Sequence, residues 1–124
     1  RMDERIDCVR SVTDGRYVYL RNFMPHLSQG QHVEYQFQTP TTRVWSELHK
    51  SGKATDAQSI FWRAPKAPHE LYDLTTDLSE QTNLATQKPE LTSRIADILK
   101  TAHAESPLWP MPKEADGGGK NAKQ

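Results

Sequence analysis

Two runs of β-branched and aromatic residues near the amino end of the chain predict an antiparallel hairpin. The runs are 6–13 and 16–23, and the Asp-Gly pair at 14–15 between them favours a two-residue type I′ turn. That turn would place Val12 opposite Tyr17. Apolar residues fall on both faces of the predicted hairpin, so we expect both faces to be partly covered.

Three later segments carry the marks of helices. A Thr-Pro pair begins a helix over 39–52, where apolar residues recur at helical spacing and a glycine ends the pattern. The capping-box spacing of Thr55 and Gln58 predicts a short helix over 56–62. The clearest helix begins at Pro89, and its apolar side chains share one side: Leu91, Ile95, Ile98, Leu99 and Ala102. We expect this last helix to cover one face of the sheet.

The stretch 70–85 combines several turn and strand signals within a short length. Two leucines flank a tyrosine at 71–74, which suits a half-buried strand. Asp77 and Glu80 have capping-box spacing and predict a short helix, which Asn83 would end by taking a left-handed backbone conformation.

These elements predict an α+β fold, with a small antiparallel sheet of three to four strands covered by a long C-terminal helix. The hairpin supplies two strands and 71–74 a third. The alternating polar and apolar residues at 33–37 are a candidate for the fourth. We expect a single domain over 1–112, followed by a flexible tail at 113–124 on account of its glycine-rich composition.

Composition excludes several classes of function. The 124 residues carry equal numbers of basic and acidic side chains, so no excess charge points to a nucleic-acid partner. No apolar run approaches the roughly 20 residues that cross a membrane. Cys8 is the single cysteine, which excludes an internal disulfide and a cysteine metal cluster. The chain begins at Arg1 rather than at a methionine, and we expect it to be a piece of a longer protein.

Candidates for chemistry within the chain are few. The histidines stand singly, without the spacing or the carboxylate neighbours of a metal site: His26, His32, His49, His69 and His103. Cys8 lies in a predicted strand with no base beside it, so we expect a small core residue rather than a nucleophile. The alternating charges at 1–7 are expected to form surface ion pairs rather than an acid–base pair.

The order of these segments resembles the sulfatase family. Residues 70–85 resemble the signature near the carboxyl end of sulfatases, in which a Glu-Leu-Tyr-Asp-Leu strand precedes an acidic turn and an Asn-Leu-Ala exit. Residues 1–5 and 9–20 resemble the entry into the carboxyl-terminal subdomain and its first hairpin. Further segments are similar to the heparan N-sulfoglucosamine sulfohydrolase branch: 22–26, 38–45 and 61–63. The resemblance covers roughly 1–110, and Leu78 departs from it where proline is common.

The resemblance implies that this chain is the C-terminal subdomain of a hydrolase of sulfuric esters or sulfamates that acts on sulfated sugars. In that family a hydrated formylglycine beside a calcium ion attacks sulfur, and both lie in the catalytic domain. The Cys/Ser-x-Pro-x-Arg motif that yields formylglycine does not occur in this chain. We therefore expect no catalytic residue, no metal site and no cofactor here, and no activity from the fragment alone. The family also implies a periplasmic or secreted parent.

The expected partners are a sulfatase catalytic domain and a sulfated carbohydrate. The resemblance implies that the subdomain closes one side of the active-site cleft and contacts substrate. Our candidates for that role are Arg1, Arg5, His26 and His32, because cations and imidazoles suit a sulfated sugar. The alternative is a stand-alone α+β interaction module that binds a partner through its hairpin or through the Pro/Trp-rich segment 107–112.

Overall fold

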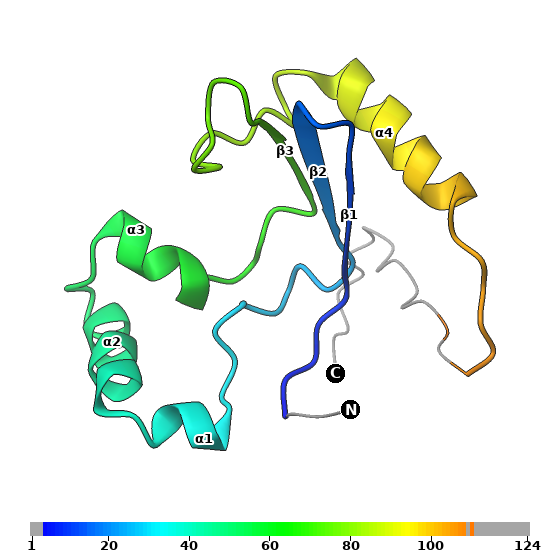
Figure 1. Ribbon diagram of the computed structural model, residues 1–124. Helices are drawn as coiled ribbons and strands as arrows, with labels where there is room; N and C mark the ends of the chain where they lie inside the picture. The colour runs from blue at the N-terminus through cyan, green and yellow to red at the C-terminus, as the bar shows by residue number, and fades with distance from the viewer. Residues whose placement is uncertain (1–3, 109, 111–124) are drawn as a thin grey trace, which may run out of the picture.

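The computed structural model describes residues 4–108 and 110, and it has the predicted α+β architecture (Figure 1). One antiparallel sheet has the strand order β1-β2-β3, formed by β1 (Val9–Thr13), β2 (Tyr17–Asn22) and β3 (His69–Asp73). The helix α4 (Pro89–Thr101) packs on this sheet against β1 and β2. A helical lobe lies on the far side of the sheet from α4 and contains α1 (Glu34–Phe37), α2 (Pro40–Lys50), α3 (Asp56–Ser59) and the 3-10 helix η1 (Ile60–Trp62).

The hairpin is confirmed, but its predicted register is wrong by two residues. Val12 lies opposite Tyr19 instead of Tyr17. The cause is the Asp14 carboxylate, which accepts hydrogen bonds from the backbone N–H groups of Arg16 at 2.9 Å and Tyr17 at 2.7 Å and so lengthens the loop. The same bonds, that from Tyr17 first, hold the pKa of Asp14 below its ordinary value. A shift of two leaves every side chain on its predicted face, because side chains alternate with period two.

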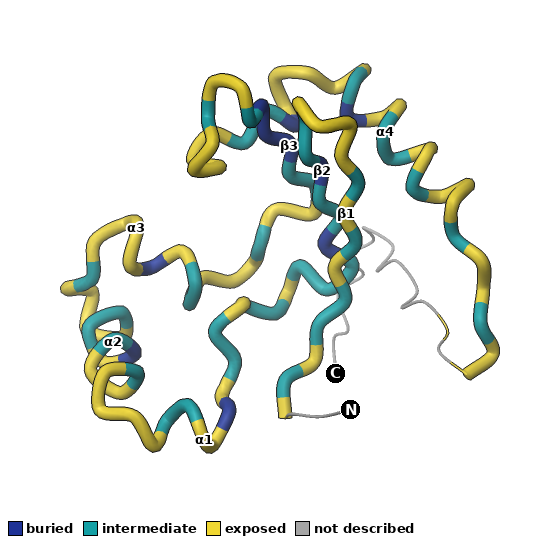
Figure 2. Tube along the Cα trace, in the orientation of Figure 1, coloured by how far each residue is buried: buried dark blue, intermediate teal, exposed yellow. Residues whose placement is uncertain are grey.

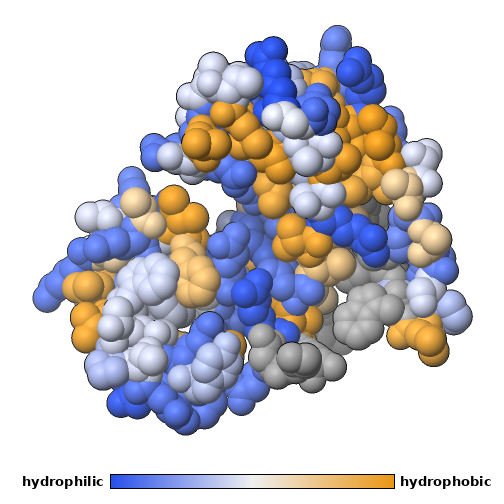
Figure 3. Space-filling model, viewed as in Figure 1, coloured by the Kyte–Doolittle hydropathy of each residue, from blue (hydrophilic) through white to orange (hydrophobic). Residues whose placement is uncertain are grey.

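The core lies between the sheet and α4. Tyr19 and Leu71 are fully buried cross-strand partners on β2 and β3, and Ala85 joins them from the segment that follows β3. Helix α4 covers them with partly buried side chains: Leu91, Ile95, Ala96 and Leu99. Figure 2 shows the buried positions concentrated in the strands, and Figure 3 shows apolar residues gathered over the sheet and α4. Each large apolar side chain buried there contributes about 1.5–3 kcal/mol.

The helical lobe has its own aromatic cluster. The ring of Trp45 stacks on that of Phe61 with centroids 4.9 Å apart, and Trp62 meets both rings edge-on. Gly30 packs against one side of this cluster, and its N–H donates to the Phe61 carbonyl at 2.6 Å. A Cβ at Gly30 would lie 2.5 Å from the Trp62 ring, so only glycine permits this approach.

The candidate fourth strand is wrong, since its residues form α1 instead of pairing with the sheet. Gln36 and Phe37 donate their N–H groups to the Val33 carbonyl, which closes a helical turn. The N–H of Glu34 donates to the Glu4 carboxylate at 2.8 Å, so a distant acidic side chain caps the helix start. The sheet therefore has three strands among the described residues.

The short helix predicted from the Asp77 capping box is also wrong. The Asp77 carboxylate accepts from the N–H groups of Gln81 at 3.1 Å and Thr82 at 2.7 Å, which lie beyond the position that a capping box requires. The resulting turn places Glu80, and not Asn83, in the left-handed region, with φ 53°. The side chain of Asn83 instead bonds to the edge of β3.

The other predicted helices are present. Thr55 and Gln58 form the expected reciprocal capping box at the start of α3. Thr39 precedes Pro40 at the start of α2, although its hydroxyl donates to the Gln36 carbonyl instead of capping the helix. The tail predicted at 113–124 lies outside the described residues.

Candidate functional site

The predicted substrate-binding residues come from two segments that the fold brings side by side. Arg1 lies outside the described residues. Arg5 belongs to the amino-terminal segment, whereas His26 and His32 belong to the loop between β2 and α1. The amide of Gln31 joins the two segments, since it accepts from the Ile6 N–H at 3.0 Å and donates to the Ile6 carbonyl at 2.5 Å.

A buried ion pair ties in a third segment. The Lys66 ammonium lies 2.6 Å from the Asp7 carboxylate, with side chains only 6% and 8% exposed. The Lys66 N–H also donates to the Pro25 carbonyl at 2.7 Å. Removing one partner of such a pair leaves an uncompensated buried charge, at a cost of about 3–5 kcal/mol. We call the surface formed by 4–8, 24–33 and 63–68 the junction, because it lies between the sheet and the helical lobe (Figure 1).

The three described candidates sit at the exposed side of the junction. Arg5 approaches the Asp7 carboxylate at 3.5 Å and is 40% exposed. The Nε2 atom of His32 lies 3.1 Å from the Glu34 carboxylate, and its ring packs 4.5 Å from the Phe37 ring. His26 is exposed within the loop. The junction thus presents a guanidinium and two imidazoles on its surface. The buried ion pair between Lys66 and Asp7 holds the backbone of the junction in place.

Polar bonds hold the signature strand β3 and its exit in place. The Arg16 guanidinium makes a bidentate contact with the Asp73 carboxylate, since Nη2 donates to Oδ2 at 2.7 Å and Nε donates to Oδ1 at 3.3 Å. The Thr75 hydroxyl donates to the same carboxylate at 2.6 Å. Arg16 first, and then Thr75, hold the pKa of Asp73 well below its usual range. Burial, followed by the hydrogen bond to Glu70, raises the pKa of Tyr72 above its usual range.

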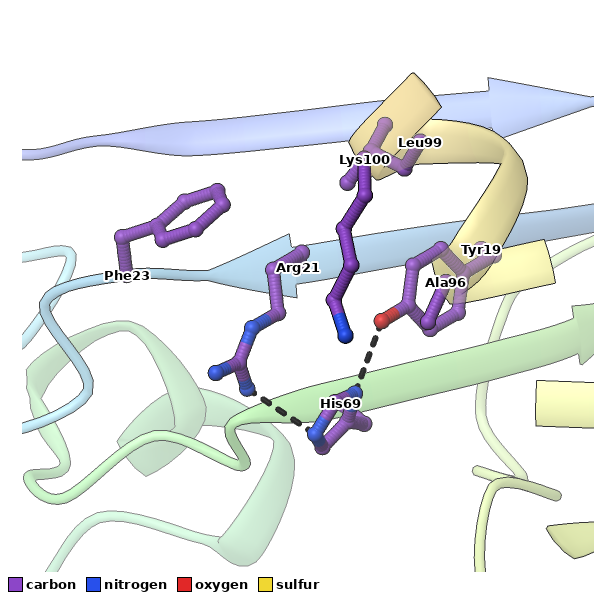
Figure 4. A pocket seen from close by; sticks show the side chains of 7 residues that line it. All are labelled: Tyr19, Arg21, Phe23, His69, Ala96, Leu99 and Lys100. Carbon is purple, nitrogen blue, oxygen red and sulfur yellow. Dashed lines mark hydrogen bonds between the residues drawn. The ribbon is translucent and has the colours of Figure 1, made fainter. Parts of the chain in front are cut away.

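A second polar constellation was not predicted from the sequence. His69 on β3 lies between two residues of β2, with Nδ1 2.7 Å from the Tyr19 hydroxyl and Nε2 2.9 Å from Nη1 of Arg21 (Figure 4). These side chains line a cavity of about 180 Å³ beneath α4, together with Phe23, Ala96, Leu99 and Lys100. Only the β2–β3 register, which sets Arg21 opposite His69, could have revealed this grouping.

Within residues 4–108 and 110, no group of three or more His, Cys, Asp and Glu side chains is placed to hold a metal ion. The helices in that part of the chain are all too short or too polar to traverse a bilayer. Cys8 is half-buried and carries a free thiol.

Comparison with known proteins finds similarity to a sulfatase. The chain is 31% identical over 100 residues to an "Ulvan-active sulfatase" of Formosa agariphila. The match covers 81% of this chain and 17% of that protein, so the chain spans about a sixth of the curated relative's length. No family model matches the chain, and no solved structure matches it. The sequence is therefore related to part of a sulfatase.

Proposed function

We propose that this chain is the C-terminal subdomain of a sulfatase and that it closes and supports one side of the active-site cleft. The observation that carries the proposal is the match to a sulfatase over 100 residues, in which 81% of this chain aligns with only 17% of the relative. The chain therefore corresponds to one part of a longer sulfatase. The resemblance of 70–85 to the carboxyl-end signature of the family supports placing the match near the end of the parent. The observed sheet and covering helix suit a supporting role.

The chemistry of the parent would reside outside this chain. The proposed parent hydrolyses a sulfuric ester or a sulfamate on a sulfated sugar, and it uses formylglycine and calcium. The residues present here do not fit either group. The chain has no Cys/Ser-x-Pro-x-Arg motif, and its described carboxylates form no cluster suited to a cation. The fragment alone is therefore inactive under this proposal.

The junction is the proposed point of contact with substrate. Arg5, His26 and His32 present cationic and imidazole groups on its exposed side, and Arg1 would extend the same segment. Charge-assisted hydrogen bonds from such groups favour a sulfated sugar. Residues 22–26 are similar to the heparan N-sulfoglucosamine sulfohydrolase branch. This similarity supports a sulfamate, as well as a sulfuric ester, as the group that the parent hydrolyses.

The first test is the coding region upstream of Arg1. A Cys/Ser-x-Pro-x-Arg motif a few hundred residues before Arg1 is expected. A gene that starts at Arg1 would instead favour the stand-alone interaction module. Sulfate release from a sulfated sugar by the isolated 124-residue chain would also contradict the proposal, because it would place the catalytic groups here.

The second test addresses the junction in the complete parent protein. Changing His26 and His32 together to alanine is expected to lower kcat/KM for a sulfated oligosaccharide by about tenfold or more, the effect of losing charge-assisted bonds. His49→Ala on α2 is the matched control and should stay within about twofold. Unchanged kinetic constants in the double variant would remove the junction from the substrate site.

A further inference from the structure

The helical lobe has an open hollow where α1 meets α2 (Figure 1). Its volume is about 280 Å³, close to the lower end of the roughly 300–1,000 Å³ that pockets for small ligands occupy. No charged side chain is among the described residues that line it. We call it the aromatic hollow, and its lining combines three aromatic with three uncharged polar residues: Tyr35, Trp45, Phe61, Gln36, Thr39 and Thr42.

The aromatic side of the hollow is held in place by the fold. The Trp45 indole N–H donates to the Gln58 carbonyl at 2.6 Å, and the Trp45 ring stacks on the Phe61 ring with centroids 4.9 Å apart. Tyr35 differs from these two residues, because it is 64% exposed on α1. The hollow therefore combines a fixed aromatic side with one exposed ring. A fixed surface loses little conformational entropy when a ligand binds.

Neutral hydrogen-bonding groups lie beside the rings. The described bonds of Gln36 use its backbone, so its side-chain amide is left to donate and to accept. The Thr39 hydroxyl donates its single hydrogen to the Gln36 carbonyl at 2.6 Å. Thr39 also lies 2.7 Å from the Thr42 hydroxyl, which is then the donor of that contact. Both threonine oxygens keep a lone pair, so the hollow offers donors as well as acceptors.

A ligand that fits this lining has an apolar face and an edge of neutral hydroxyl groups. A purely apolar ligand would leave the Gln36 amide desolvated and unpaired, which is unfavourable. A charged ligand would find no opposite charge in the lining. A pyranose ring meets both requirements, because C–H bonds occupy its faces and hydroxyl groups project from its edge. We propose that the aromatic hollow binds one uncharged pyranose unit, with a C–H face against Tyr35 and hydroxyl groups bonded to Gln36 and Thr42.

This site goes beyond the proposed role of the junction, which concerns a charged sulfate group. The two surfaces are close, since His32 of the junction precedes Tyr35 by three positions and three residues span at most about 11 Å. One oligosaccharide can therefore place a sulfated unit at the junction and a neutral unit in the hollow. Binding of a neutral sugar needs neither a sulfate group nor turnover, so the two proposals can fail separately.

The test is an NMR titration of the full chain with cellobiose, whose equatorial linkage leaves flat C–H faces on both glucose rings. Mannitol is the matched probe, because it carries hydroxyl groups without a ring. We expect saturable shifts of the Trp45 indole N–H and of the Tyr35 and Gln36 amides with cellobiose only. Tyr35→Ala should weaken binding by about fivefold or more, and Gln36→Ala by about three- to tenfold. Shifts that mannitol reproduces would overturn the proposal.

Control variants separate binding from folding. Val44→Ala changes a residue of α2 that is 60% exposed and outside the lining of the hollow, and it should bind as the parent chain does. Tyr35→Phe keeps the ring and should bind within about twofold of the parent chain. If Tyr35→Ala disturbs the amide spectrum of the free chain, Gln36→Ala decides. Affinity in Gln36→Ala equal to that of the parent chain would refute the site.

A second arm uses maltose, whose axial linkage turns the two glucose rings away from each other. Tighter binding of cellobiose assigns an extended, equatorially linked sugar chain to the hollow, whereas equal binding assigns a single ring. Absence of binding by both sugars overturns the proposal. Shifts at the same residues that follow the protein concentration would assign the hollow to a second copy of the chain and would also overturn it. Either failure would leave the sulfatase proposal standing.

Discussion

Replacing Asn83 by alanine should destabilise the chain by detaching the exit segment from the edge of β3. The Asn83 side chain accepts from the N–H groups of Leu71 at 3.0 Å and Ala85 at 2.9 Å, and it donates to the His69 carbonyl at 3.0 Å. A hydrogen bond contributes about 0.5–1.5 kcal/mol net, and more when its partner is left buried and unpaired. Three such bonds predict a loss of about 2–4 kcal/mol in the free energy of unfolding.

Urea denaturation followed by circular dichroism measures this loss. With a slope of about 1.5 kcal/mol per molar urea, the midpoint should fall by about 2 M. Gln81→Ala is the matched control, because Gln81 is exposed on the preceding turn and its described bond uses the backbone N–H. Hydrogen exchange gives a local check, since the amides of Leu71 and Ala85 should lose protection in Asn83→Ala. Retained protection at both amides, or a midpoint within error of the control, would refute the reasoning.

Three further outcomes are expected. Leu71→Ala should cost about 2–5 kcal/mol by urea denaturation because Leu71 is fully buried, whereas Leu78→Ala, 82% exposed, should change stability by less than about 0.5 kcal/mol; equal effects would contradict the assigned core. Gly30→Ala should destabilise by about 1–3 kcal/mol, since the added methyl meets two aromatic rings, and an unchanged melting temperature would contradict that packing. The depressed pKa of Asp73 stabilises the fold above its unfolded value near 3.9 and is lost as pH falls through the folded value. The difference in melting temperature between the parent chain and Arg16→Gln should therefore be full at pH 7 and shrink in acid, and a pH-independent difference would count against the pair.

Elements that depend on hydrophobic periodicity could be predicted from the sequence. The apolar stripe on α4 is confirmed for Leu91, Ile95 and Leu99, which pack on the core. It is wrong for Ile98, which is 51% exposed, and for Ala102, which is also exposed. The hairpin faces were predicted correctly from the alternation of residues along the strands. Its register was not, because register depends on how the Asp14 carboxylate bonds within the loop, and the Asp-Gly pair alone favours a shorter turn.

Features that join distant residues could not be predicted. The cap that turns 33–37 into a helix comes from Glu4, 30 positions away. The Asp7–Lys66 pair spans 59 positions, so no pattern of nearby residues could predict the junction that this pair holds together. The cavity around His69 requires the β2–β3 pairing to be known first. Arg5, His26 and His32 were selected through a family resemblance, and their role in binding substrate stays a prediction.

The position of Asn83 and Leu84 makes the two borders of the sheet unequal. Asn83 caps the N–H of Leu71, and the Leu84 N–H donates to the Leu71 carbonyl at 2.7 Å, so the outer border of β3 is already occupied by the chain itself. Among residues 4–108 and 110, no strand pairs with the outer border of β1. Exposed strand borders are templates for self-association. Among the described residues, Val9–Thr13 is therefore the strand border left open to a strand from another molecule, and a lysine or proline placed there should keep isolated copies apart.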